Sequence, residues 1–332
     1  MNSFEKRFAG PDRVVGAEKD TENKLKSMAK KQIQTDQTPL VNERIKTPEE
    51  IEIISDILNR LPDFVNEYGA TQERPIHTDQ IHILDHQNNE TRKIKSNFET
   101  NVIGGYSPSE SRIEILSHKS NIKMGHVLVH ELIHANSFLS VTLRKDGEGT
   151  TENPLASLRR FGFVISKEGT VNQAWFKYLN EATTEELTKR FCTKFFPEIR
   201  LLKKEFLLHR SAEKASEEPN DPPLASLMNE AIISNPLYVY FDERAVFITL
   251  VELLYKKNPK KFETYEDVFK LFSKAMLQGN LLPPARLIEQ TLGKGTFRKI
   301  GEKTQYAAED SIKSLHDTYK NLSSENTKKN TS

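Results

Sequence analysis

The feature that most constrains this chain is a pair of histidines, His130 and His134, inside the apolar segment Gly125–Asn136. The apolar residues around the pair predict a largely buried helix from about Ser120 to Leu143. Side chains four residues apart lie on the same face of a helix, about 6 Å from one another. Buried imidazoles need polar partners, and a single metal ion can bind both of them.

Residues 130–134 read His-Glu-Leu-Ile-His, the His-Glu-x-x-His pattern of zinc proteases. Two imidazoles one turn apart can each approach a zinc ion to about 2.0–2.1 Å. Glu131 would lie beside the metal and could take a proton from a metal-bound water. His126 cannot complete the ligand set, because residues eight apart on a helix are about 12 Å apart along its axis. For His126 we expect an exposed position or a contact with a group that supports the ligands.

A catalytic zinc ion usually has three protein ligands and one open position. No histidine follows His134 until His209, so the third ligand is sought among the acids. If Leu179–Leu187 begins a helix, Glu181 can bind the metal. Glu185, one turn later, can then accept a hydrogen bond from the outer nitrogen of a ligating histidine.

A rival acid lies further along the chain. Met228–Ser234 repeats Asn-Glu-Ala around Glu230, but a serine stands four residues after that glutamate, where the first segment has an acid. The strand-like residues that precede Glu181 are also missing there. We therefore favour Glu181 over Glu230 as the third ligand.

The two motifs, at 130–134 and at 180–185 (Asn-Glu-Ala-Thr-Thr-Glu), resemble those of the gluzincin superfamily of zinc peptidases, the thermolysin-like group and its minigluzincin relatives. The resemblance implies a zincin-like fold and a zinc metallopeptidase acting on peptide or protein substrates. It implies Glu181 as third zinc ligand, Glu131 as general base and Glu185 as partner of the first histidine. It also implies an edge strand ahead of the metal helix that holds the substrate in extended form.

Two other functions stay open at this stage. One is a zinc-binding regulatory or interaction module without catalysis, against which the retention of Glu131 beside the metal argues. The other is a helical interaction protein in which the histidine pattern is accidental. A metal site formed by four protein ligands would favour the first, and the absence of a carboxylate near the two histidines would favour the second.

Gluzincins usually add a tyrosine, histidine or arginine that donates a hydrogen bond to the oxyanion. In Asn235–Arg244, Tyr240 and Arg244 resemble a tyrosine-to-arginine stretch downstream of the glutamate in small gluzincins. The same residues are equally consistent with packed aromatic rings and an arginine in a salt bridge near a helix start. Other possible donors in the sequence are Tyr178, Tyr238 and His209.

A second group of histidines precedes the metal helix, at His77, His82 and His86. On a strand, His77 would point away from the other two, which prevents all three from reaching one ion. We therefore predict histidines in contact with solvent and no second metal site.

The periodicity of apolar residues predicts an α+β fold, with a small mixed sheet, then the metal helix, then a mostly helical C-terminal part. Thr47-Pro48-Glu49-Glu50 forms a capping box that should begin a helix over residues 48–68. The predicted strands lie near Ile76–Ile83, Ile103–Tyr106 and Arg112–Leu116, a hairpin near Phe161–Ile165 and Val171–Leu179, and later helices at Phe241–Tyr255, Tyr265–Leu277 and Pro284–Leu292.

The order of these elements predicts three regions. Residues 1–46 are a flexible polar leader, with an inhibitory plug over the active site as the alternative. Residues 47–300 form the catalytic domain. Residues 301–332 form a polar C-terminal helix and tail, with Ile312, Leu315, Tyr319 and Leu322 as one apolar stripe.

Composition excludes several partners. The chain has 48 basic and 47 acidic residues in 332, a net charge of +1, so neither nucleic acid nor an anionic membrane is expected as its main partner. The single cysteine, Cys192, permits no internal disulfide and is expected to be buried in a helix. The N-terminus lacks the apolar stretch of a signal peptide, and no run of about 18 apolar residues occurs. We therefore expect a cytoplasmic protein.

Overall fold

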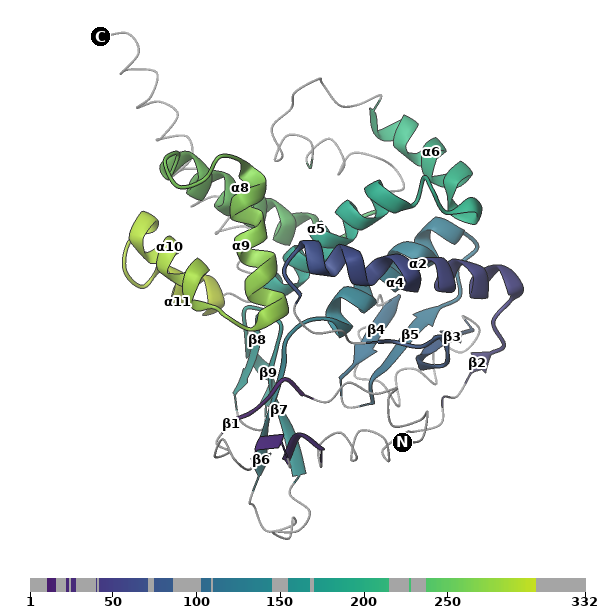
Figure 1. Ribbon diagram of the computed structural model, residues 1–332, viewed down its shortest axis with the longest axis horizontal. Helices are drawn as coiled ribbons and strands as arrows, with labels where there is room; N and C mark the ends of the chain where they lie inside the picture. Colours follow the sequence, from purple (N-terminus) through teal and green to yellow (C-terminus); the bar gives the residue numbers. More distant parts are fainter. Residues whose placement is uncertain are drawn as a thin grey trace.

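The computed structural model arranges the chain as two β-sheets with helices packed on and around them (Figure 1). The α+β class predicted from the sequence is confirmed. Within the described part of the chain, no helix combines the length and the apolar character that a membrane span requires. The structure describes residues 11–15, 22–23, 25–27, 40, 42–70, 75–85, 103–108, 110–144, 155–167, 170–214, 227 and 237–302.

The first sheet contains β2 (Glu43–Arg44), β3 (Ile81–Leu84), β4 (Gly104–Ser107) and β5 (Arg112–Leu116) in the order β2-β3-β5-β4. β3 and β5 are parallel, whereas β2 and β4 are antiparallel to their neighbours, so the sheet is mixed and β4 is an edge strand. The three strands predicted ahead of the metal helix are therefore present. The first of them begins only at Ile81, after a short 3-10 turn.

Helix α2 (Pro48–Glu67) begins with the predicted capping box. The Thr47 hydroxyl accepts the Glu50 N–H at 3.2 Å, and the Glu50 carboxylate accepts the Thr47 N–H at 2.8 Å. Arg44 of β2 donates to the same carboxylate at 2.9 Å, which ties the start of the helix to the sheet. The apolar face of α2, which includes Ile53, Ile54 and Ile57, is fully buried.

The helix predicted to carry the two histidine ligands, for which the name metal helix is kept, is α4 (Asn121–Ala135), and it is shorter than predicted. It ends at Asn136, and residues 139–144 form strand β6 (Leu139–Arg144) instead of two further turns. The Asn136 and Ser137 side chains donate to the carbonyls of Leu132 and Ile133 at 2.8 and 3.0 Å, which satisfies acceptors of the last turn. The prediction was wrong because the apolar residues at 139, 141 and 143 fit either period over so short a run.

The second sheet follows the metal helix and has the order β1-β6-β7-β8-β9. β8 and β9 form the predicted hairpin, whose expected turn at Glu168-Gly169 lies outside the described residues. β1 pairs in parallel with β6, so this part of the region expected to be a leader belongs to a sheet. The remaining bounds are β1 Arg13–Val15, β7 Leu155–Phe161, β8 Val164–Lys167 and β9 Thr170–Trp175.

Helices make up the described chain from Lys177 onward, as predicted. Tyr178 and Leu179, expected at the end of a strand, already belong to the first of these helices. The apolar stripe predicted at 312–322 and the rest of the C-terminal region beyond 302 lie outside the described residues. The bounds are α5 Lys177–Phe195, α6 Arg200–Lys214, α8 Phe241–Lys257, α9 Tyr265–Gln278, α10 Leu282–Leu292 and α11 Thr296–Glu302.

One buried apolar cluster extends from Ile53 in α2 to Ile300 in α11. It includes side chains of α4, α5, α8 and α9 and the buried isoleucines of the first sheet. Cys192 lies within it, fully buried, as predicted. The metal helix is therefore held on several sides by packed apolar side chains, which fixes the positions of the polar groups that it carries.

Gly104 lets the edge strand β4 lie directly against the metal helix. A Cβ atom at this position would stand 2.3 Å from Cγ1 of Val127 in α4, and 3.3 Å from Oε1 of Glu131. Val127 is buried and β-branched, so its side chain has little freedom to move aside. Only glycine permits this separation of strand and helix.

Substitution Gly104→Ala is therefore expected to lower the free energy of unfolding by about 1–3 kcal/mol, the usual cost of overpacking. Chemical denaturation of the single variants, Gly104→Ala and Val127→Ala, and of the double variant measures this cost. Because Val127→Ala removes the clashing methyl group, the double variant should be more stable than the sum of the two single effects implies. Additive effects would contradict the proposed clash.

Candidate metal centre

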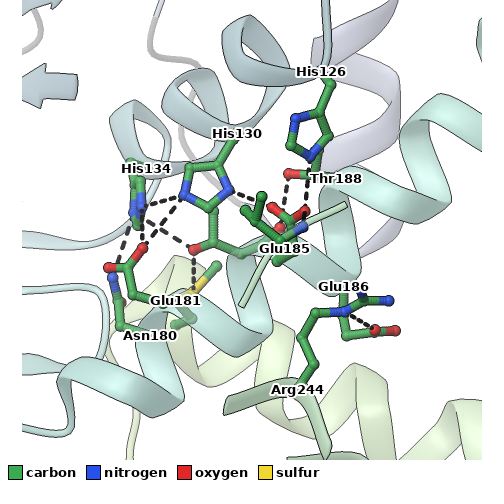
Figure 2. Close-up of polar contacts among 12 residues, drawn as sticks. His126, His130, His134, Asn180, Glu181, Glu185, Glu186, Thr188 and Arg244 are labelled. Atoms are coloured by element: carbon green, nitrogen blue, oxygen red, sulfur yellow. Dashed lines mark hydrogen bonds and ion pairs between the residues drawn. The ribbon is translucent and has the colours of Figure 1, made fainter. Parts of the chain in front are cut away.

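Three side chains from two helices converge on one point (Figure 2). Nε2 of His134 lies 3.1 Å from Nε2 of His130 and 3.2 Å from Oε2 of Glu181, and the last two atoms are 3.4 Å apart. Among the described residues, this is the one group of histidine, cysteine and acidic side chains arranged to hold a metal ion. The two histidines and the glutamate predicted as ligands are thus brought together.

The separations of these atoms fit a tetrahedral ion. Ligand atoms bound at about 2.0–2.1 Å to a tetrahedral ion stand about 3.3 Å from one another. The three observed distances, 3.1, 3.2 and 3.4 Å, lie close to that value. The His130 and His134 side chains are 7% and 8% exposed and that of Glu181 is 27% exposed, so the group is open to solvent on the glutamate side.

The crossing of α4 and α5 produces this convergence. His130 and His134 occupy successive turns of α4, and Glu181 lies in the first turns of α5. Ala182, Thr183 and Thr184 are fully buried, and side chains this small permit two helices to approach closely. The Thr183 hydroxyl donates to the Leu179 carbonyl one turn earlier, at 2.7 Å, so its burial leaves no unsatisfied donor.

Glu185 contacts the outer ring nitrogen of His130. Nδ1 of His130 lies 2.7 Å from Oε2 of Glu185, which is the predicted contact. With the proton on Nδ1, a neutral imidazole carries its lone pair on Nε2, the atom that faces Glu181. Burial opposes the charged form of Glu185, but His126 and His130 outweigh this effect and hold its pKa well below the usual range. The carboxylate is therefore ionised.

His134 has a different set of neighbours. Its Nδ1 lies 3.4 Å from the Asn180 amide nitrogen and 3.5 Å from the Thr184 hydroxyl. The amide oxygen of Asn180 accepts the Phe163 N–H at 2.9 Å, which fixes the amide orientation. When Nε2 binds a metal, Nδ1 carries the proton, and the Thr184 hydroxyl oxygen is then its available acceptor.

Glu131 lies beside the cluster and is not part of it. Its side chain is buried, and the backbone N–H of Tyr106 in β4 donates to its carboxylate. Burial raises the pKa of Glu131, and the neighbouring imidazoles only partly offset this effect. A carboxylate with a raised pKa and a fixed position accepts a proton more readily than an exposed one.

Each of the two histidines packs against an aromatic ring. Tyr240 stacks on His130, with ring centroids 5.6 Å apart and an interplanar angle of 19°. Phe161 of β7 packs on His134 at 5.6 Å, and its other neighbour is Tyr106 of β4 at 5.7 Å. The nearby charges of Glu181, together with burial, raise the pKa of Tyr240. Its hydroxyl therefore keeps its proton and can act as a donor.

Arg244, the second candidate for the oxyanion, occupies a buried ion pair. Its Nε donates to Glu186 at 2.8 Å, and Figure 2 shows this pair apart from the three clustered groups. Arg190, which lies on α5 together with Glu186, donates to the other carboxylate oxygen of Glu186 at 2.8 Å. The arginine thus forms the salt bridge near a helix start that the sequence left open as an alternative.

His126 is a buried residue whose position the sequence left open between two alternatives. It is 3% exposed and bonds Glu185 at 2.7 Å, so the expectation of an exposed position was wrong and the alternative, a contact with a supporting group, is correct. The signal in the sequence was the spacing of four residues between His126 and His130, which places both side chains on one face of the helix. Asn180 stood inside the quoted motif without a role, and nothing in the sequence pointed to Gly104.

The other predicted histidine and acid groups lie elsewhere. His82 pairs with Glu43 of β2 at 2.7 Å, as part of the first sheet. His86 and Glu230 lie outside the described residues. Comparisons of the chain with protein-family models, with curated proteins and with solved structures find no match. The assignment of a function therefore depends on the geometry described above.

Loss of the buried Arg244–Glu186 pair should destabilise the fold. Arg244→Met leaves Glu186 with Arg190 alone and is expected to cost about 3 kcal/mol of unfolding free energy at pH 7. Burial would raise the pKa of Glu186, but Arg244, with smaller contributions from Arg190 and Lys189, lowers it from 4.5 to about 2. A lowered folded-state pKa gives stability that is present above pH 4.5 and lost as pH falls towards 2.

The difference between wild type and Arg244→Met should therefore shrink across that pH range, as denaturation at several pH values would measure. The matched control is Arg200→Met, since the Arg200 side chain is 73% exposed in its pair with Glu52 and such pairs contribute about 0–1 kcal/mol. A similar effect of both substitutions would refute a stabilising role for the buried pair.

Proposed function

We propose that this protein is a zinc-dependent peptidase. The observation that carries the proposal is the set of three donor atoms, at mutual distances of 3.1–3.4 Å, with a buried carboxylate beside them. Two histidines and one glutamate are a ligand set of catalytic zinc sites, in which the fourth position stays open for water or substrate. Structural zinc sites usually have four protein ligands, commonly with cysteines, and Cys192 is fully buried in the apolar core.

His130, His134 and Glu181 would hold the ion, and Glu185 would keep His130 in the ligating tautomer. Bound zinc supplies Lewis-acid chemistry: it lowers the pKa of a water molecule towards about 7 and polarises a carbonyl group. The proposal depends on these residues of the chain holding that ion with one side accessible, and the 27% exposure of the Glu181 side chain marks that side.

Glu131 would serve as the general base. It is fixed by the Tyr106 N–H, and its raised pKa suits a group that first accepts a proton and later delivers it to the leaving nitrogen. Tyr240, whose hydroxyl remains protonated, would donate a hydrogen bond to the oxygen on which negative charge develops. Both groups border the metal position, one on α4 and the other at the start of α8.

A peptide would bind in extended form along β4. This strand is the edge of the first sheet and lies against the metal helix through Gly104. Backbone groups on the outer edge of a strand can pair with an added strand, which positions a peptide without reading its side chains. On β4 the Tyr106 N–H already donates to Glu131, so the pairing would use the other backbone groups of this edge. Tyr106 and Phe161 would form an aromatic wall beside His134 for one substrate side chain.

The decisive experiment compares wild type with Glu131→Gln. Wild type should contain one zinc ion per chain and hydrolyse members of a peptide library. Glu131→Gln should keep the zinc but lose about 10²–10⁴-fold in kcat, because the general base is absent. Metal analysis by mass spectrometry and peptide cleavage assays measure the two quantities.

Glu198→Gln is the matched control, since this glutamate is exposed and pairs with Arg60 at 2.9 Å, away from the metal centre. A wild-type protein without zinc, or one whose hydrolysis survives Glu131→Gln, would refute the proposal. Zinc at one ion per chain with no hydrolysis of any peptide would instead favour the non-catalytic zinc-binding module.

Tyr240→Phe removes one hydroxyl and keeps the ring that stacks on His130. We expect kcat to fall by about 10²-fold with KM little changed, because the lost hydrogen bond acts mainly on the transition state. Steady-state kinetics on a cleaved peptide measures both constants. Tyr255→Phe, which removes a hydroxyl that donates to the Glu263 carbonyl at 3.2 Å, should leave both unchanged. A rise in KM of similar size, with kcat unchanged, would argue for a role in substrate binding instead.

A further inference from the structure

His126 stands one turn ahead of His130 on α4 and faces the same carboxylate. Its Nε2 lies 2.7 Å from Oε1 of Glu185, while Nδ1 of His130 lies 2.7 Å from Oε2 (Figure 2). Tyr238 packs against the His126 ring edge-on, with centroids 5.6 Å apart. His126 is 3% exposed, so its ring has a fixed position inside the protein.

Glu185 is held by three donors. Oε1 receives Nε2–H of His126 and, at 2.8 Å, the backbone N–H of Val239, while Oε2 receives Nδ1–H of His130. The carboxylate is fully buried, so no water replaces a lost donor at low cost. Without His126, Oε1 would keep the Val239 N–H as its one donor among these three, and a lone pair that now accepts a hydrogen bond would be left without one in the buried interior.

We propose that His126 is a positioning residue for the metal centre: it fixes Glu185 so that the second oxygen always meets Nδ1–H of His130. His130 then presents the lone pair of Nε2 to the metal. The proposal rests on the proposed zinc function and adds to it a residue outside the ligand set. The hydrogen bonds from His126 to Glu185 and from Glu185 to His130 link two successive turns of α4 through a side chain of α5, so the position of His126 influences the orientation of His130.

The alternative is a purely structural role, in which His126 only fills space in the core. The two explanations differ in what they require at this position. A filling role needs volume, whereas a positioning role needs an N–H at the place of Nε2. Glutamine can put an amide nitrogen close to that place, asparagine is too short to do so, and leucine has similar bulk without a donor.

The test compares zinc affinity of wild type, His126→Gln, His126→Asn and His126→Leu by competition with a chelator. Loss of a group that supports a ligand typically raises the dissociation constant about 10–100-fold. We expect His126→Leu and His126→Asn to bind zinc about tenfold more weakly, and His126→Gln to bind nearly as well as wild type. Chemical denaturation of the metal-free proteins shows how much each substitution affects the fold itself.

Cobalt substitution adds a readout of ligand geometry. The visible absorption bands of bound Co²⁺ depend on the arrangement of its ligands, so they should change in His126→Leu and return in His126→Gln. His82→Gln is the matched control, since His82 pairs with Glu43 in the first sheet. Should His126→Leu fail to fold, the pair of amide variants decides the question.

The possible outcomes distinguish a failure of the proposed zinc function from a failure of the role proposed for His126. If wild type binds no zinc, the proposed function fails and the role of His126 fails with it. If wild type binds zinc and the leucine and asparagine variants bind it equally well, the role of His126 alone is overturned. Weak binding by the glutamine variant, with loss of stability in the metal-free protein, would show that His126 acts through packing.

Discussion

The structure depends on the burial of several ionisable side chains where α4 crosses α5. An apolar interior tolerates such groups only when each donor meets an acceptor, because an unpaired buried charge costs several kcal/mol. Here the requirement is met between the two helices: His126 and His130 of α4 share the carboxylate of Glu185, and His134 lies 3.2 Å from Glu181. The two helices are thus held together by polar pairing as well as by packing.

Two aromatic residues in left-handed backbone conformations directly precede α5 and α8. Phe176, with φ of 62°, precedes α5, and Tyr240, with φ of 57°, precedes α8. Bulky residues adopt this region only at a cost of about 1–3 kcal/mol, so such strain persists where surrounding contacts impose it. Phe176 is held by ring packing on Phe297, and Tyr240 by stacking on His130. The strain at Tyr240 lies in the residue whose hydroxyl the proposed mechanism uses.

The convergence of His130, His134 and Glu181 was predictable because their faces follow from helical spacing. His130 and His134 are related by one turn, and so are Glu181 and Glu185, so each pair had a predictable face. The end of α4 was not predictable, since Leu139–Leu143 suits a strand or a helix and pairing with β1 and β7 decides it. The partner of Arg244 was equally hidden, because Glu186 lies 58 residues away and only the fold brings them together.

Glu185 and Glu186 show why α5 has little freedom to move. Adjacent residues on a helix point about 100° apart, so the first acid reaches His130 while the second reaches Arg244 of α8 and Arg190. Arg190 also forms an ion pair with Glu266 of α9, with 2.9 Å between Nη2 and Oε2. A rotation of α5 that moved Glu181 away from the histidines would also withdraw Glu186 from the buried guanidinium group of Arg244 and Arg190 from Glu266. The C-terminal helices therefore hold Glu181 in register with the two histidines.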